Sequence, residues 1–498
     1  MNLSRIVAHW AGLRPSGVAV HFDGEDLTWA ALWQRVEAAT LRLARLGLGR
    51  GDRVAYLGYN HPELLVLLFA CARLGAIFVP LNFRLARPEH EDILAHAGAA
   101  LLAAEPDFYE SAGAMRARLP QLRLVALRGA PAGWFDWEGA PPDGPEPVLA
   151  GTDADPVLIV YTSGTTGRPK GAVHTQSALL WNIVNATLYQ DFTSRDHVLT
   201  VLPLFHVGGL CIQTLPALHA GATVTLHARF DPGLWLRDVA TRRPTHSLLV
   251  PATMKAVTAH PDWAATDLSS LREMNTGSST VPASLFAPFH ARGVPVGQVY
   301  GATETGPVSM YLRAEDALRK VGAAGKPAMH AEIRLVDAQG RDAAPGEVGE
   351  IWVRAPNLMS GYWQEPDHPA FRDGWFRSGD LARVDAEGYY WVVGRSKDMI
   401  ISGGENVYPA ELENILADCP DVLEAAVVGV PDPAWGEAVV AVVARRPGVA
   451  LDERAVMRLF EGRLARYKQP RRVAFVDALP KSALGKVQKF AVRKLVGG

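Results

Sequence analysis

The sequence predicts an α/β protein with a large N-terminal domain of stacked, mostly parallel sheets, a small β-rich subdomain and a small α+β C-terminal domain. Three observations support this prediction. Short apolar strands alternate with helical segments in the first part of the chain, short strands separated by Gly/Asp turns follow from Ile333, and the pattern changes again after Arg395. A chain of 498 residues is also too long for one hydrophobic core. We therefore expect domains over residues 1–394 and 395–498.

The first part of the chain repeats a strand, a helix and a second strand. Residues 53–57 and 76–80 predict strands, and between them Asn60 is expected to cap a helix that has Pro62 in its first turn and ends at Gly75. Further strands and helices are expected at residues 157–160, 197–202, 210–219 (a helix), 222–226 and 245–250. This alternation indicates parallel sheets covered by helices on both faces.

The second part of the chain has a different pattern of apolar and turn residues. Short strands are expected at residues 333–336, 349–353 and 389–393, which indicates the β-rich subdomain. After the predicted boundary at residues 394–398, a helix at 409–417 is followed by strands at 425–430, 438–443 and 473–476. Asp452 is expected to cap a further helix, whose apolar face carries Val456, Leu459, Phe460 and Leu464.

Composition excludes several classes of protein. A hydrophobic fraction of 48% and a charged fraction of 20% indicate a soluble globular protein, and a net charge of −2 argues against nucleic acid as the main partner. The three cysteines have no zinc or redox spacing, which favours reduced thiols in the cytoplasm. The most apolar stretch, residues 64–80, is interrupted by Arg73 and Gly75, so we expect a core helix and strand there and no transmembrane segment.

The stretch Tyr161-Thr-Ser-Gly-Thr-Thr-Gly-Arg-Pro-Lys-Gly171 follows the predicted strand 157–160 and carries three glycines, four hydroxyl side chains and one lysine. Glycines let backbone N–H groups turn inward, and a run of such groups forms an anion site. An ordinary polar turn is the alternative, but a turn needs no such combination. The lysine spacing also differs from a Walker A loop. The stretch therefore predicts a phosphate-binding loop.

Four further stretches carry candidate functional groups. Residues 298–306 place an aromatic, a hydroxyl and a carboxylate between glycines, and residues 378–380 place a carboxylate in a tight turn. Residues 394–409 form a polar link with a double glycine, and residues 480–486 place a lysine beside a glycine turn. Taken singly, Asp380 could be a turn former, Arg395 a surface charge, Lys486 a solvated lysine and Tyr300 a core aromatic.

Together, in this order and spacing, the five stretches resemble the adenylate-forming (AMP-binding) superfamily, which includes acyl-CoA and aryl-CoA synthetases, firefly luciferase and the adenylation domains of peptide synthetases. The resemblance covers nearly the whole chain. Residues 79–84 and 431–437 are typical of stand-alone CoA ligases. The resemblance therefore implies an ATP-dependent acyl-CoA synthetase, an acid–thiol ligase that uses ATP, Mg²⁺ and coenzyme A.

The resemblance also implies a role for each matching residue. The β- and γ-phosphates of ATP would be held by Thr162, Ser163, Gly164, Thr165, Thr166, Gly167 and Lys170. Around the rest of the nucleotide, Tyr300 and Gly301 would lie at adenine, Thr303 at the α-phosphate, Glu304 at Mg²⁺, and Asp380 and Arg395 at the ribose. Gly277 and Ser278 replace the usual Gly-Gly-Ala-Pro or Gly-Ala-Ala-Pro turn, so side-chain roles there stay open. Lys486 would act at the forming acyl-phosphate bond, and CoA would contact Gly403, Gly404 and Trp435.

The implied reaction has two halves. A carboxylate attacks the α-phosphorus of ATP and expels pyrophosphate, and the thiol of CoA then attacks the resulting acyl-adenylate and expels AMP. In the family the small C-terminal domain is mobile and swings about a hinge, which corresponds to Lys397, so that Lys486 serves the first half and the Gly403–Gly404 face the second.

The acid-binding pocket is expected, by the resemblance, at residues 181–185, 205–210, 275–279 and 298–301. It would include Phe205, His206, Val207 and Gly208, with no Arg or Lys to pair a second carboxylate. An apolar monocarboxylic acid is therefore favoured, either aromatic or a medium-to-long fatty acid. His206 could gate this pocket or be a packed core histidine.

Two rival functions are weighed against this one: an adenylating enzyme that delivers to a carrier protein or oxidises its acyl group, and a decayed, non-enzymatic fold. Trp435 argues against delivery to a carrier protein, and the intact motifs argue against a decayed fold. The expected partners are a small carboxylic acid, ATP and CoA, with a homodimer left open.

Overall fold

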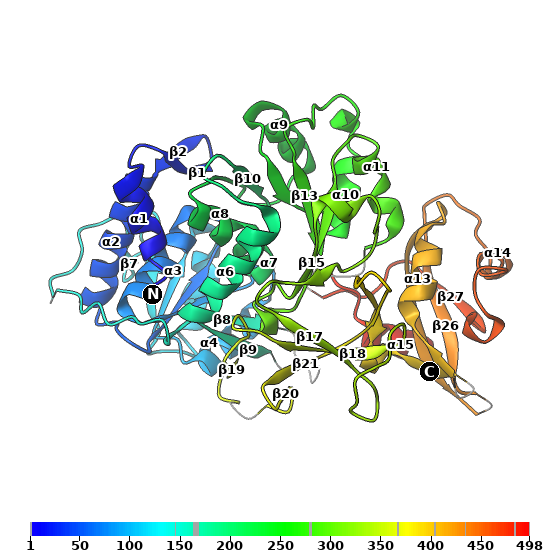
Figure 1. Ribbon diagram of the computed structural model, residues 1–498. Helices are drawn as coiled ribbons and strands as arrows, with labels where there is room; N and C mark the ends of the chain where they lie inside the picture. The colour runs from blue at the N-terminus through cyan, green and yellow to red at the C-terminus, as the bar shows by residue number, and fades with distance from the viewer. Residues whose placement is uncertain are drawn as a thin grey trace.

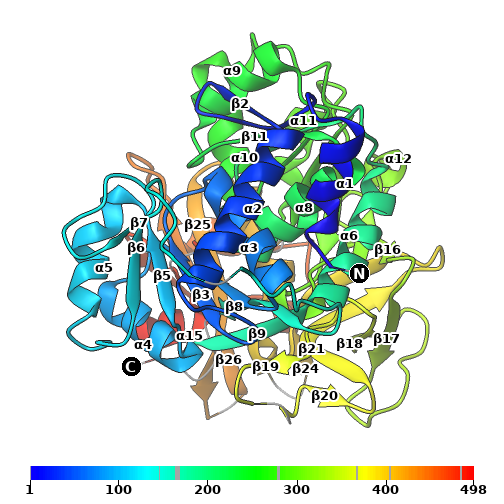
Figure 2. The same cartoon turned by 90° about the vertical axis from the view of Figure 1, so that its left-hand side faces the viewer.

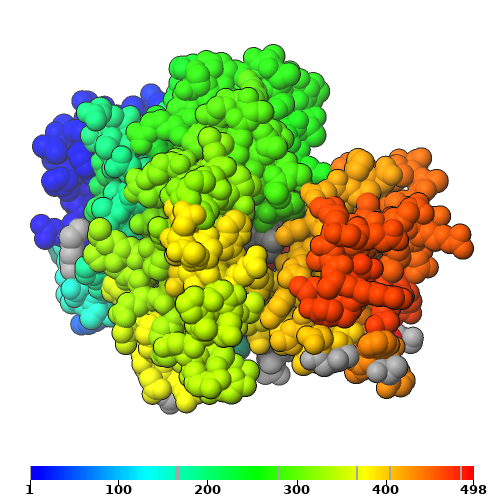
Figure 3. Space-filling model, turned by 45° about the vertical axis from the view of Figure 1, so that its right-hand side comes forward, coloured from blue at the N-terminus to red at the C-terminus, as the bar shows by residue number. Residues whose placement is uncertain are grey.

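A computed structural model describes residues 2–144, 146–162, 169–277, 281–365, 368–402, 405–433, 435–482 and 485–497. The chain forms a large body with a smaller C-terminal domain beside it (Figure 1). Figure 3 shows this C-terminal domain, in orange and red, next to the yellow and green parts of the body. The predicted fold class is confirmed in its architecture.

Two large sheets build the body. Within the described residues, the strand order of one is β16-β15-β14-β13-β12-β10-β11-β1-β2, parallel from β14 to β1. Its strands are β1 (Val18–Phe22), β2 (Glu25–Thr28), β10 (His197–Thr200), β11 (Thr223–Leu226), β12 (His246–Leu248), β13 (Glu273–Gly277), β14 (Val296–Tyr300), β15 (Met310–Leu312) and β16 (Lys326–Pro327).

The other large sheet has the order β19-β9-β8-β4-β3-β5-β6-β7 among the residues described, and it is parallel from β8 to β7. Its strands are β3 (Arg53–Leu57), β4 (Ile77–Pro80), β5 (Leu101–Ala104), β6 (Arg123–Ala126), β7 (Phe135–Asp136), β8 (Pro156–Thr162), β9 (Lys170–Thr175) and β19 (Gly361–Tyr362). Each predicted strand of the first part therefore has a counterpart. Strands β4, β10 and β11 are shorter than predicted by one or two residues, β12 is shorter by three, and β8 is longer.

Helices fill the space between the two sheets and cover their outer faces. The main core cluster joins side chains of both sheets with α1 (Arg5–Leu13), α2 (Trp29–Arg45), α3 (Pro62–Leu74), α6 (Gln176–Gln190) and α8 (Leu215–Ala220). The outer face of one sheet packs on α4 (Arg87–Ala97) and α5 (Tyr109–Met115), and that of the other on α9 (Pro232–Arg242), α10 (Pro251–Thr258) and α11 (Ala287–His290), as Figure 2 shows.

Helix α3 corrects one detail of the prediction. Its N-cap is His61, whose ring accepts a hydrogen bond from the Glu63 N–H, and the helix ends at Gly75 with φ of 74°. Asn60 is instead buried, and its side chain bonds the backbone of Leu202, Leu204 and His227. Asn60 therefore ties the two sheets together rather than capping the helix.

The β-rich part comprises β17 (Glu332–Val336), β18 (Gly349–Arg354), β20 (Phe371–Arg372), β21 (Trp375–Val384) and β22 (Tyr390–Arg395). Strand β22 pairs with β21, which brings Asp380 opposite Arg395. The turn η6 (Ser396–Asp398) follows β22 and leads into the C-terminal domain.

The C-terminal domain packs helices on a small sheet. The sheet contains β23 (Ile400–Ser402), β24 (Glu405–Val407), β25 (Val422–Asp432), β26 (Gly436–Arg445) and β27 (Arg472–Val476), with α13 (Pro409–Ala417), α14 (Glu453–Arg458) and α15 (Lys489–Val496). Asp452 caps α14 as predicted, but the helix ends well before Leu464. Gly462, at φ of 69°, adopts a left-handed conformation that a helix cannot continue. Phe460 is nevertheless fully buried.

Candidate active site

Asp380, Arg395 and Tyr300 form the first part of the candidate site. The Tyr300 hydroxyl donates to Asp380 Oδ2 at 2.8 Å, and Arg395 Nε lies 2.8 Å from Asp380 Oδ1. Arg395 also donates to the Ser378 carbonyl at 3.3 Å. Burial, followed by the negative charge of Asp380, raises the pKa of Tyr300, so its hydroxyl stays protonated and acts as a donor. The Asp380 carboxylate thus connects the end of β14 with β21 and β22.

Thr303 and Glu304 lie just beyond β14, in the short turn η5 (Thr303–Thr305). Thr303 is buried, while the Glu304 carboxylate accepts from the Tyr362 hydroxyl at 2.7 Å. The chain can make this turn because Gly301 has no side chain: a Cβ there would lie 1.6 Å from the Pro307 carbonyl oxygen. The carboxylate is therefore held in place by a side chain from β19.

Gly277 closes β13 beside this turn. A Cβ at this position would lie 2.5 Å from the Val299 carbonyl oxygen, so the backbones of β13 and β14 approach each other closely here. Ser278 lies outside the described residues.

Lys170 begins β9, at the far end of the predicted phosphate loop. Its Nζ lies 3.1 Å from Glu365 Oε2 and 2.9 Å from His368 Nε2, and Thr162 Oγ1 bonds the Lys170 carbonyl at 3.4 Å. The loop residues Ser163, Gly164, Thr165, Thr166 and Gly167 lie outside the described residues. The ends of the loop are thus set beside Glu304, since Tyr362 contacts both the Lys170 ammonium and the Glu304 carboxylate.

Lys486 comes from the other domain, on a turn whose flanks Lys481 and Val487 pair. Part of the Lys486 side chain is exposed to solvent, although many protein atoms surround it. Burial lowers the pKa of Lys486, and the charge of Arg395 lowers it further, while Asp380 and Glu304 oppose the shift. The carboxylates of Asp380 and Glu304 thus act on the Lys486 ammonium across the junction of the two domains.

His206 shares this region. Its Nδ1 accepts from the Gly208 N–H at 3.0 Å and caps α7 (Val207–Gly209). Burial, followed by the positive charge of Lys486, lowers the pKa of His206 to about 4. The ring is therefore neutral at physiological pH. The ring caps a short helix, and its role as a gate of the acid pocket stays a prediction.

The remaining pocket residues lie close by. Phe205 packs edge-to-face on Phe83, with 5.5 Å between ring centroids, and Val207 and Gly208 are buried. After α7 the chain continues as a π-helix, η2 (Leu210–Thr214), a rare form that is common at functional sites.

Lys397 and Trp435 lie outside the cluster. Lys397 sits in η6, and its carbonyl accepts from Arg493 of the C-terminal domain at 3.4 Å. Trp435 is partly exposed on the C-terminal domain, with the Arg471 guanidinium 3.6 Å above its ring. Gly403 and Gly404 lie outside the described residues.

The motifs did not predict Tyr362, Glu365 or His368. These side chains hold Glu304 and Lys170, but they lie in a stretch with no glycine-rich or charged pattern. Only the pairing of β19 with β9 brings them to the site, and no local signal in the sequence announces that pairing.

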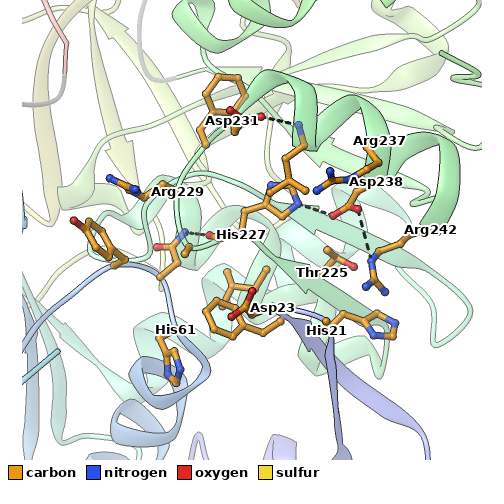
Figure 4. A pocket seen from close by; sticks show the side chains of 18 of the residues that line it. His21, Asp23, His61, Thr225, His227, Arg229, Asp231, Arg237, Asp238 and Arg242 are labelled. Atoms are coloured by element: carbon orange, nitrogen blue, oxygen red, sulfur yellow. Dashed lines mark hydrogen bonds and ion pairs between the residues drawn. The ribbon is translucent and has the colours of Figure 1, made fainter. Parts of the chain in front are cut away.

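A cavity of about 810 Å³ lies apart from the cluster, near the ends of β1, β3, β5 and β11 (Figure 4). Its lining includes Tyr59 and Arg229 and none of the predicted site residues that the structure describes. Figure 4 shows Asp238 between His227 and Arg242, and His227 Nε2 is 2.7 Å from Asp238 Oδ2. Asp238 thus pairs with two basic residues of the lining. The candidate chemistry lies instead at the junction of the two domains.

Comparison with known proteins gives the family. The AMP-binding enzyme family matches residues 7–363, and the AMP-binding enzyme C-terminal domain matches residues 411–486. The chain belongs to the AMP-binding enzyme family. It is 49% identical to an indoleacetate–CoA ligase of Aromatoleum aromaticum, over 100% of this chain and 98% of that one. It is 45% identical to a feruloyl-CoA synthase of an Amycolatopsis species, over 98% and 97%.

A solved structure is similar throughout. An anthranilate CoA ligase in complex with anthranoyl-AMP has a TM-score of 0.91 and 28% sequence identity, covering 99% of this chain and 97% of that one. The predictions of family, fold and an AMP-forming acid–thiol ligase that uses ATP and CoA are confirmed. Among the described helices, none is long and apolar enough to cross a membrane.

Proposed function

We propose that this AMP-binding enzyme activates an aromatic monocarboxylic acid and transfers it to CoA. The observation that carries the proposal is the position of Lys486, a C-terminal-domain lysine that lies within electrostatic reach of Asp380, Glu304 and His206 of the large domain. The choice of an aromatic acid over a fatty acid is supported by the arylacetate and cinnamate-type acids in the names of the two relatives.

In the proposed first half-reaction, like charges are the main obstacle, because a carboxylate must approach a polyanionic phosphate. Lys486 would pair with the acid and the α-phosphate and so lower this repulsion. Asp380 would exchange its bond with Tyr300 for the ribose hydroxyls, leaving the Tyr300 ring at adenine. Lys170 would leave Glu365 and His368 for the departing pyrophosphate.

Mg²⁺ fits this arrangement. The cation binds proteins through one or two carboxylates and completes its shell with phosphate oxygens and water. Glu304 is a single carboxylate, oriented by Tyr362 and lying near the phosphate loop. A bound Mg²⁺ would supply charge neutralisation at the phosphates. A cytoplasmic location is also part of the proposal, supported by three free cysteines, of which Cys71 and Cys211 are buried.

The decisive variant is Lys486→Ala. Acyl-adenylate formation, measured as pyrophosphate release, should fall at least about a hundredfold. Thioester formation from a supplied acyl-adenylate and CoA should stay within a few-fold of wild type. Lys494→Ala, an exposed lysine of the same domain, is the matched control and should change neither half. An equal loss in both halves would contradict the proposed role.

The substrate class is tested separately. Pyrophosphate release should be measured over a panel of aryl, arylacetic, cinnamic and straight-chain acids, with and without CoA. We expect the highest kcat/KM among the aromatic acids, and a thioester product by mass spectrometry. A maximum among acids of twelve or more carbons would overturn the aromatic assignment.

A further inference from the structure

A cluster of buried polar side chains lies on α6, η2 and β13, and we name it the polar floor. It consists of Tyr189, Gln190, Gln213, Glu273 and Asn275, none more than 5% exposed. Polar side chains are costly to bury, and five together need either mutual hydrogen bonds or a ligand.

Two elements connect the reaction centre to this floor. The charge of Lys486 reaches His206, and Gln213 follows seven residues later along α7 and η2, about 10 Å further along the helix at helical rise. Gly277 ends β13 beside the nucleotide turn, and Asn275 lies on the same face of the strand, about 7 Å back. Both elements therefore place the floor about one ring system away from the reacting carboxylate.

Apolar side chains pack beside the floor. Ala186, Ile212, Val299 and Val308 belong to one buried cluster that also contains Tyr189. An apolar wall with a few fixed polar groups at its end is the usual design of a small-molecule site.

The hydrogen bonds of the floor fix the orientation of every amide. Gln190 Nε2 donates to the carbonyls of Ile212, at 2.8 Å, and Ala186, at 3.2 Å, so its oxygen must be the acceptor. That oxygen receives Gln213 Nε2 at 2.8 Å and Asn275 Nδ2 at 3.2 Å. Asn275 Oδ1 in turn accepts from the Tyr189 hydroxyl.

Two oxygens of the floor have no hydrogen-bond partner among the described residues, Glu273 Oε1 and Gln213 Oε1. Since Gln213 must present its nitrogen to Gln190, its Oε1 points elsewhere, and among the described residues it has no hydrogen-bond partner. A buried acceptor without a donor costs free energy, so a ligand that supplies an N–H or O–H would recover it.

The other side of the floor leaves no room for the ligand. A Cβ on Gly297 would lie 2.2 Å from Glu273 Oε1, 2.6 Å from Asn275 Oδ1 and 2.7 Å from the Tyr189 hydroxyl. These groups are packed directly against the backbone of β14. The floor is thus closed on the side of β14.

We propose that the polar floor recognises a ring N–H or O–H at the end of the acid remote from its carboxylate, with Gln213 Oε1 as the acceptor. An alkyl chain of similar length would cover the floor without satisfying it and so be disfavoured. The inference rests on the proposed function, because it assumes that the carboxylate lies at Lys486.

The test compares acids that differ only in the donor. Indole-3-acetate is paired with benzothiophene-3-acetate, in which sulfur replaces N–H, and 4-hydroxycinnamate with 4-methylcinnamate. We expect wild type to favour the donor member of a pair by roughly tenfold or more in kcat/KM. Gln213→Met keeps the side-chain length but removes the acceptor, and should reduce that ratio to about two or less. Gln339→Met, at an exposed turn, is the matched control and should retain the wild-type ratio.

Each outcome decides between the two proposals. If wild type turns over both members of each pair equally, the floor does not read a donor, while the aromatic assignment stands. This wild-type ratio decides the matter even if Gln213→Met fails to fold. If Gln213→Met folds and keeps the preference, Gln213 is not the acceptor and the inference falls. If no aromatic acid is turned over, the proposed function falls and this inference falls with it.

Discussion

Glu273 should make the protein less stable as pH rises, and Glu273→Gln should remove this effect. The carboxyl is 5% exposed, and burial raises its pKa from the ordinary 4.5 to about 8, while its bond with Tyr189 and the charge of Arg313 oppose the shift only in part. Between these two values the unfolded chain has lost the proton and the folded chain keeps it.

The sign and size follow from that difference. The folded state binds one more proton than the unfolded state, so the free energy of unfolding falls by about 1.4 kcal/mol per pH unit in this interval. From pH 5.5 to 8 this amounts to roughly 3 kcal/mol, and the decline ends once both states are ionised. The amide of Glu273→Gln cannot ionise, so the variant lacks this contribution.

Guanidinium unfolding followed by tryptophan fluorescence, at half-unit steps from pH 5.5 to 8.5, measures the difference. The stability of the variant relative to wild type should rise by roughly 3 kcal/mol across the series. Glu461→Gln, at an exposed site of the other domain, controls for the loss of one charge and should show no such rise. Parallel pH profiles for Glu273→Gln and wild type would refute a neutral Glu273.

Three further variants test the packing and the site. Phe460→Ala should destabilise the C-terminal domain by about 3–5 kcal/mol, because Phe460 is fully buried, and the loss should appear in thermal unfolding. Asp452→Ala removes the cap of α14 and should lower the free energy of unfolding by about 1 kcal/mol in the same measurement. Asp452→Asn should keep most of the stability that the cap provides. Tyr362→Phe leaves Glu304 without its 2.7 Å donor and should slow pyrophosphate release about tenfold at unchanged melting temperature; an unaffected rate would show that Glu304 needs no such positioning.

The sequence predicts best where one local signal decides the structure. Helix α13 has the predicted bounds because Pro409 is favourable at the first helical position, and β3 coincides with its apolar run. It predicts poorly where neighbours compete. Asn60 and His61 can both cap α3, and the burial of Asn60 between the two sheets decides for His61. The apolar positions Phe460 and Leu464 likewise suggest a longer helix, but α14 ends at Arg458 and the chain continues in turns.

The candidate site likewise contains residues that a local sequence signal predicts and residues that it does not. Tyr300, Glu304, Asp380, Arg395 and Lys486 lie in motifs that are dense in glycine and charge. Of these residues, the structure joins Tyr300, Asp380 and Arg395 by direct contacts. The residues that orient them, and those of the polar floor, come from separate helices and strands with ordinary local composition. Their chemistry arises from burial and pairing, which only the fold supplies.

The connection between the domains shows where a rotation would have to occur. Arg395 is fixed to the large domain, because its side chain bonds Asp380 and the Ser378 carbonyl. Two residues later the carbonyl of Lys397 is bonded by Arg493 of the C-terminal domain. Any swing that the two proposed half-reactions require must therefore be absorbed near the peptides between these two anchors. Asp380 holds Arg395 and would also hold the ribose of the nucleotide. The nucleotide and the first anchor of the hinge therefore share one carboxylate. Because of this, nucleotide binding can influence which face of the C-terminal domain is presented to the site.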